Sequence, residues 1–122
     1  MNDAELARRT KAFALRVVRL VASLPKSREA DVLGRQLLRA GTSVGANYRE
    51  ARRGRSKADF AAKIGVCLQE ADESSYWLEL LAESKIVRAD LLRDLQKEAG
   101  QLTAIFAASA KTARPRTDLK KT

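Results

Sequence analysis

Apolar side chains recur at steps of three and four residues in four successive segments of this chain, and this spacing limits the possible folds more than any other feature. It places the apolar side chains on one face of an α-helix. β-branched residues are few and never alternate with polar ones over a strand length. We therefore predict an all-α protein with helices over about 3–24, 28–53, 57–84 and 90–112.

Short connections separate the predicted helices. Pro25 ends the first helix, because proline disfavours helical geometry in the residue before it. Ser27 and Ser56 can cap the second and third helices, and Gly54 can stop the second. Four amphipathic helices joined by short turns predict an antiparallel up-down-up-down four-helix bundle.

The 122 residues fit one domain with a continuous core. We expect the bundle to occupy residues 1–113, and residues 114–122 to form a basic, disordered tail. Glycines in the second helix indicate a close approach of another helix rather than a catalytic loop; they are Gly34, Gly41 and Gly45.

The predicted core contains one apolar stripe from each helix. The stripe of the first helix is wide, more than one bundle core needs, and comprises Leu6, Phe13, Ala14, Val17, Val18, Leu20, Val21 and Leu24. The stripe of the fourth helix comprises Leu91, Leu95, Leu102, Ile105 and Phe106.

The net charge of +9 is unevenly distributed. Residues 1–63 contain 15 Lys and Arg against 6 Asp and Glu, whereas residues 64–110 contain 4 against 8. This asymmetry fits two explanations: binding of an anionic polymer, or charge matching between copies of the protein.

The composition argues against an enzyme. There is no histidine, and the single cysteine, Cys67, lies on an apolar stripe. Histidine-dependent triads and the Glu-x-x-His pairs of bundle di-iron centres are therefore impossible, and no phosphate-binding glycine loop is present. We expect no catalytic residue, metal or cofactor. With no membrane-spanning run, no signal sequence and no disulfide, we expect a cytoplasmic protein without a membrane partner.

A polar stripe runs along the second and third predicted helices. Folding the hairpin between them brings Arg39 opposite Glu70 and Asn47 opposite Lys63. We interpret the stripe as ion pairs and hydrogen bonds that fix helix register, because polar groups inside a bundle need partners. Its members are Arg39, Ser43, Asn47, Glu50, Glu70, Glu73 and Trp77.

The run "REARRGRSK" at residues 49–57 is the densest group of cations. It is either a solvated helix end or a phosphate-binding surface; arginine suits bidentate phosphate contacts, and Tyr48 could stack on a base. We predict the second, with sequence-indifferent contacts. The predicted nucleic-acid-binding residues are Arg49, Arg52, Arg53, Arg55 and Lys57, helped by Arg8, Arg9, Arg16 and Arg19.

The segment "LRAGTSVGANYREARRGRSKADFAAKIGVCLQEADESSYWLELL", residues 38–81, resembles the four-helix-bundle proteins of the 23S rRNA intervening-sequence (S23-like) family. The shared features are Ser43, "GAN" at 45–47, Glu50, "RSKADF" at 55–60 and "EADESSYWLELL" at 70–81. The resemblance implies a bundle that assembles as a ring-shaped homopentamer and has no catalytic residues. A related branch, the accessory variability determinant of diversity-generating retroelements, binds nucleic acid and a reverse transcriptase; that role is an analogy only.

Two hypotheses of function remain. The first is a non-enzymatic homo-oligomer, of five copies, that binds the backbone of RNA or DNA, with RNA favoured. The second is a protein–protein interaction scaffold or accessory subunit, with a reverse transcriptase as the partner by analogy.

Overall fold

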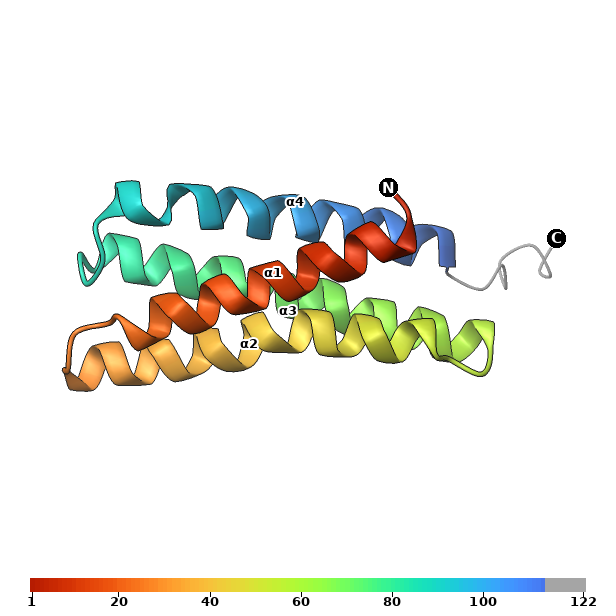
Figure 1. The fold of residues 1–122 in the computed structure, drawn as a ribbon, viewed down its shortest axis with the longest axis horizontal. Coiled ribbons are helices and arrows are strands. Elements are labelled where there is room, and N and C mark those ends of the chain that lie inside the picture. The colour runs from red at the N-terminus through yellow and green to blue at the C-terminus, as the bar shows by residue number, and fades with distance from the viewer. Residues whose placement is uncertain (114–122) are drawn as a thin grey trace, which may run out of the picture.

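The computed structural model describes residues 1–113, which form four α-helices and, within that range, no strand. The helices are α1 (Asp3–Ala22), α2 (Arg28–Arg52), α3 (Lys57–Glu83) and α4 (Ala89–Ala113). They alternate in direction along the bundle (Figure 1), which confirms the predicted all-α architecture. The tail predicted over residues 114–122 lies outside the described residues. None of the four helices is long and apolar enough to cross a membrane.

Side-chain caps fix the starts of the first three helices. The Oγ atoms of Ser27 and Ser56 accept hydrogen bonds from the backbone N–H groups of Ala30 and Asp59, both at 3.1 Å, which confirms the two predicted caps. Asn2 caps α1 in the same way.

The core forms along the helix faces that the periodicity predicts, with corrections to the first and fourth. In α4 the buried positions follow steps of three and four, and Leu91 falls outside this pattern. Its side chain is 67% exposed, whereas that of Leu92 is fully buried. One residue turns a helix by about 100°, so a stripe assigned one position too early faces solvent. For the same reason Val18 of α1 is exposed beside the buried Val17. The buried residues of α4 are Leu92, Leu95, Ala99, Leu102 and Phe106.

Helix α1 packs mainly against α2 and touches α4 sparsely. It crosses the bundle obliquely, so that its first turns lie toward α4 and its last turns lie against α2 (Figure 1). A Cβ atom at Gly34 would lie 2.9 Å from Leu24 Cδ1, and one at Gly41 would lie 2.8 Å from Val17 Cγ2. These glycines confirm the predicted close approach, because a side chain at either position would collide with α1. The glycine contacts with α1 end at Gly45 and Thr10, and toward its N-terminus α1 leaves α2 and approaches α4 (Figure 1).

Candidate nucleic-acid interface

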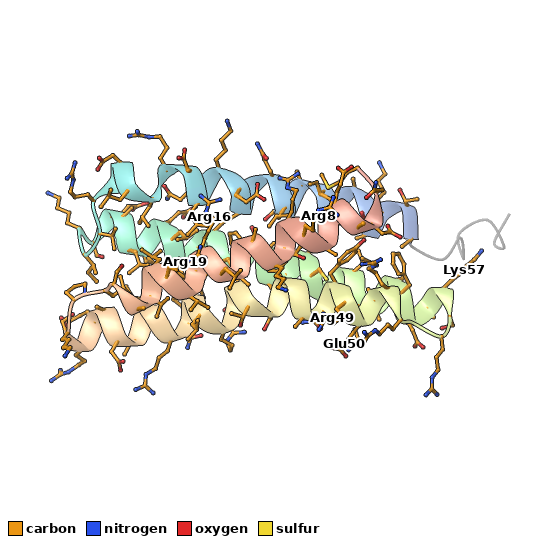
Figure 2. All side chains as sticks on the ribbon, in the orientation of Figure 1. Arg8, Arg16, Arg19, Arg49, Glu50 and Lys57 are labelled. Carbon is orange, nitrogen blue, oxygen red and sulfur yellow. The ribbon has the colours of Figure 1, made fainter. Side chains whose placement is uncertain are left out.

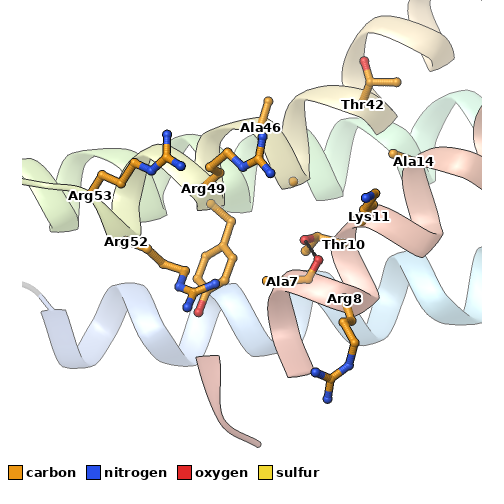
Figure 3. A pocket seen from close by; sticks show the side chains of 12 residues that line it. Ala7, Arg8, Thr10, Lys11, Ala14, Thr42, Ala46, Arg49, Arg52 and Arg53 are labelled. Atoms are coloured by element: carbon orange, nitrogen blue, oxygen red, sulfur yellow. Dashed lines mark hydrogen bonds between the residues drawn. The ribbon is translucent and has the colours of Figure 1, made fainter. Parts of the chain in front are cut away.

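A cavity of about 670 Å³ lies between α1 and α2 where the two helices diverge. Figure 3 shows it from close by, with α1 on one side and the C-terminal half of α2 on the other. It is lined by Ala7, Arg8, Thr10, Lys11, Ala14, Thr42, Gly45, Ala46, Tyr48, Arg49, Arg52 and Arg53.

Five of the lining residues are cations and none is an acid. Arg8 and Lys11 come from α1, three residues apart; Arg49 and Arg52 come from the last turn of α2, and Arg53 is its C-cap. Within residues 1–113, no ion pair involves any of the five. The cavity therefore gathers five positive charges that take part in no ion pair within residues 1–113, and such a surface attracts anions.

Small residues create the open space between the charged side chains. Ala7 and Ala14 line the α1 side, and Gly45 and Ala46 line the α2 side. At Gly45 an added Cβ would lie 3.2 Å from the Oγ1 atom of Thr10, so glycine permits the close contact at which the cavity begins. Larger side chains at these positions would fill the cavity.

Tyr48 lines the cavity but cannot stack on a base, which corrects the sequence interpretation. Its side chain is only 3% exposed, and its ring packs against that of Phe106 with centroids 5.8 Å apart. The hydroxyl donates a hydrogen bond to Oδ1 of Asp3 at 3.2 Å. Burial, followed by the charge and hydrogen bond of Asp3, raises the pKa of Tyr48 to about 12, and nearby Arg52 opposes this shift.

Four of the nine predicted phosphate-binding residues line the cavity: Arg8, Arg49, Arg52 and Arg53. Four others are placed elsewhere. Arg55 lies in the α2–α3 turn and Lys57 begins α3, at the end of the bundle, whereas Arg16 and Arg19 lie farther along α1 (Figure 2).

Arg9, the ninth predicted residue, forms hydrogen bonds with side chains of α4. Its Nε and Nη2 atoms donate to the two carboxylate oxygens of Glu98 at 3.0 and 2.7 Å, and Nη2 also donates to Gln101 at 2.9 Å. The hydrogen bond with Glu98 raises the pKa of Arg9, against the opposing effect of burial. Arg9 therefore connects α1 to α4 through an ion pair, and we do not include it in the candidate nucleic-acid interface.

Lys11 is the cavity cation that the sequence interpretation missed. It follows Arg8 and Arg9 in the sequence "RRTK" at residues 8–11. The signal was nevertheless available: Lys11 lies three residues after Arg8, so the two share a face of α1.

The predicted polar stripe lies across the α2–α3 interface. Arg39 donates from Nη1 to Oε2 of Glu70 at 3.1 Å, and from Nη2 to Glu73. Glu73 also accepts a hydrogen bond from the indole Nε1 of Trp77 at 2.9 Å. Because Arg39 is about half exposed, with 49% of its side chain accessible, the network lies at the surface of the bundle rather than inside it.

The middle of the stripe differs from the sequence interpretation. Lys63 Nζ donates to Oε1 of Glu50 at 3.1 Å, and not to Asn47. The Asn47 side chain donates to the carbonyl of Ser43, and the hydroxyl of Ser43 donates to the carbonyl of Arg39. A charged partner was available to Lys63 one turn closer to the hairpin, and it forms the stronger bond.

Cys67 is a core residue. It is fully buried, its Sγ contacts the carbonyl oxygen of Val44 at 3.5 Å, and burial raises the pKa of the thiol to about 12. Residues 1–113 contain no group of three or more His, Cys, Asp or Glu side chains that could hold a metal ion.

A family model and a solved structure, both similar to this chain, point to the same family. The family model described as 23S rRNA-intervening sequence protein matches residues 2–108. A crystal structure from Bacteroides thetaiotaomicron, described as a protein with unknown function from the S23 ribosomal protein family, is similar with a TM-score of 0.84 and 33% identity. The similarity covers 91% of this chain and 99% of that chain. No curated protein matches the chain.

Proposed function

The chain belongs to the 23S rRNA-intervening sequence protein family, and from this premise we propose that it is a non-enzymatic oligomer that binds nucleic acid. RNA is the favoured ligand, given the family's association with rRNA genes. The contacts are sequence-indifferent and are made to phosphates. We also propose a cytoplasmic location, where the single cysteine stays reduced.

One observation carries this proposal: five cations without ion-pair partners in residues 1–113 line one cavity that no acid lines. Like charges held this close repel one another, and a polyanion relieves the repulsion. Each phosphate contact also releases condensed counterions from the nucleic acid, so affinity falls steeply as salt rises. Four of the five cations are arginines, whose planar guanidinium groups can make bidentate contacts with phosphate.

The assembly we propose is a homopentamer. Leu15 and Val18 lie three residues apart on α1 and are 45% and 43% exposed, an apolar face that a second copy can cover. A closed ring would repeat the cationic cavity, and linked weak contacts gain strongly in avidity. Light scattering at micromolar protein and moderate salt tests this proposal, and a monomer mass contradicts it.

The experiment that tests binding is a salt titration with structured RNA and with duplex DNA. The test variant replaces Lys11, Arg49 and Arg52 by glutamine. We expect weaker binding of both polymers and a salt slope flatter by about 2, since each contact contributes about 0.7 to the slope on a single strand and somewhat more on a duplex.

A matched control removes the same charge elsewhere. Lys26, Arg93 and Lys97 are exposed and form no ion pair within residues 1–113, so their replacement by glutamine lowers the net charge equally. If the two triple variants bind alike at every salt concentration, the cavity is not the interface. If the parent protein itself binds neither polymer, the proposed function is wrong.

A second candidate function, the interaction scaffold, is favoured by a different observation. Tyr76 on α3 is 52% exposed and lies edge-on to Trp77, beside the network of Arg39, Glu70 and Glu73. An exposed aromatic residue next to arginine is typical of protein interfaces. Absence of nucleic-acid binding in the parent protein would leave this as the function to pursue, with a reverse transcriptase as one partner to try by analogy.

A further inference from the structure

We propose that the α1–α2 cavity accepts one nucleotide of a single strand, with its phosphate on the cations and its base and sugar against the small residues. This inference deepens the proposed function and rests on it. It goes further than a charged surface, because it requires an occupant of the cavity and a preference for unpaired nucleic acid.

The first argument is the size of the cavity. Its volume of about 670 Å³ falls within the range of roughly 300–1,000 Å³ in which small-molecule sites lie. A base with a pentose and one phosphate belongs to this size class, whereas phosphate alone would leave most of the space unfilled. A surface that only attracts phosphates needs no hollow at all.

The second argument is the division of the lining into two chemistries. Both helices contribute cationic side chains to the lining, and Figure 3 shows Arg49 and Arg52 on α2 with Lys11 and Arg8 on α1. Between them lie the methyl groups of alanines and the backbone at Gly45. A nucleotide has the matching division, with an anionic end and a flat, weakly polar base.

The third argument concerns what contacts the base. Tyr48 is buried against Phe106 and offers no ring face, so stacking on an aromatic residue is not available. The planar guanidinium groups of Arg49 and Arg52 can stack on a base instead, as arginine does in many single-strand sites. Such contacts tolerate any base, in agreement with sequence-indifferent binding.

Single strands follow from the shape of the site. A duplex keeps its bases stacked and paired, so its backbone can reach only the charged rim. A flexible strand can turn one nucleotide out of line and into the hollow without breaking base pairs. The cavity therefore favours a flexible single strand over a duplex, whereas the cationic side chains alone would bind both.

The test fills the cavity and keeps every charge. Ala46 lines the cavity and is exposed on α2, so Ala46→Leu adds volume there without disturbing the core. The probes are a short labelled RNA and the same RNA annealed to its complement, titrated at one low salt concentration. We expect Ala46→Leu to weaken single-strand binding by about tenfold or more and duplex binding by less than about twofold.

The matched control is Ala62→Leu, an equal change at an exposed position of α3 that does not line the cavity. It should bind both probes like the parent protein. A competition arm separates a nucleotide from a bare anion: adenosine monophosphate should displace the labelled strand at lower concentration than inorganic phosphate does. Unfolding curves of both variants check that each is folded.

The outcomes separate the two proposals. If Ala46→Leu binds both probes as tightly as Ala62→Leu does, the cavity holds no nucleotide, while the proposed function stands on the rim cations. Equal competition by adenosine monophosphate and phosphate also overturns the inference, since only an anion would then be recognised. A parent protein that binds neither probe overturns both proposals.

Discussion

Helix α2 presents cations to both of its neighbours, and the two sides differ in what those cations meet. Toward α3, Arg39 contacts Glu70 and Glu73 at the surface of the interface. Toward α1, Arg49 and Arg52 face a cavity that no acid lines. The same residue type, within 13 positions of one helix, is neutralised on one side and left charged on the other.

This difference shows how to separate structural charge from charge available to a ligand. A cation with carboxylate partners across a helix interface has a role in register, and removing it should change stability. A cation without such partners makes no stabilising contact in the fold, so removing it should change binding and leave stability nearly unchanged. The density of cations at residues 49–57 does not show which of them are available to a ligand, whereas the presence or absence of a carboxylate partner does.

The largest effect we predict compares the closed and open parts of the α1–α2 contact. Gly41→Leu should lower the free energy of unfolding by about 3 kcal/mol, the upper end of the usual range for overpacking, because the new leucine side chain collides with the buried Val17. Ala46→Leu, in the open part, should change it by less than about 0.5 kcal/mol. Denaturant unfolding curves of the two variants measure both values. Equal losses would mean that the helices do not diverge beyond Gly45.

The sequence predicted the closed part well and the open part poorly. Gly34 and Gly41 are seven residues apart, about two helical turns, so they share the face of α2 toward α1. The close approach of another helix could be predicted from these glycines alone. The cavity depends instead on the angle at which α1 crosses the bundle, which is set by long-range packing. The exposure of Leu91 has the same kind of cause: Leu91 and Leu92 both fit a helical pattern, and only the packed neighbours decide which of them is buried.

The candidate site was predictable only in part for a related reason. Arg8 and Arg9 are adjacent and identical in the sequence, yet one lines the cavity and the other contacts Glu98, 89 residues away along the chain. No local pattern reports such a distant partner. Lys11, by contrast, could have been included from its spacing to Arg8.

The next effect compares Arg8 with Arg9. Arg9→Gln should cost about 1–2 kcal/mol of unfolding free energy, because it breaks two charge-assisted bonds and strands the partly buried Glu98. Arg8→Gln should leave stability within about 0.5 kcal/mol and weaken RNA binding. Thermal unfolding and an RNA titration of each variant measure the two effects. If Arg8→Gln were the less stable variant, our division of charges would be reversed.

A smaller effect is expected on the α3 side. Glu70→Gln should lower stability by about 1 kcal/mol or less, because Arg39 is half exposed and keeps Glu73 as a second partner. A fully buried pair would instead cost about 3–5 kcal/mol. Chemical unfolding of the single variants and of the double variant with Arg39→Gln gives the coupling energy. A loss above about 3 kcal/mol would show that the network is more enclosed than the exposure of Arg39 indicates.

The smallest effect concerns Tyr48, where the core meets the cavity. Its pKa is raised from the ordinary 10.0 to about 12, so the neutral phenol is favoured in the folded state. Because the folded pKa lies above the unfolded one, this contribution to stability is complete below about pH 10 and is lost as the pH rises to about 12. Asp3→Asn should lower the pKa of Tyr48, since it removes the negative charge beside the phenol. The phenolate absorbance of Tyr48 can be followed alone in a Tyr76→Phe background, because these are the only two tyrosines.

Glu5→Gln is the matched control for this titration, because Glu5 shares the acidic first turn of α1 with Asp3 but makes no hydrogen bond to Tyr48. It removes the same charge from the helix N-terminus, so any effect of the helix dipole is common to both variants. We expect the phenolate to form at lower pH in Asp3→Asn than in Glu5→Gln. If the two titrate together, Asp3 does not act on Tyr48 directly. The Asp3 carboxylate would then be available to the neighbouring Arg52. Arg52 would in that case be a neutralised cation, as Arg39 is on the α3 side, and only four of the five cavity cations would be available to a ligand.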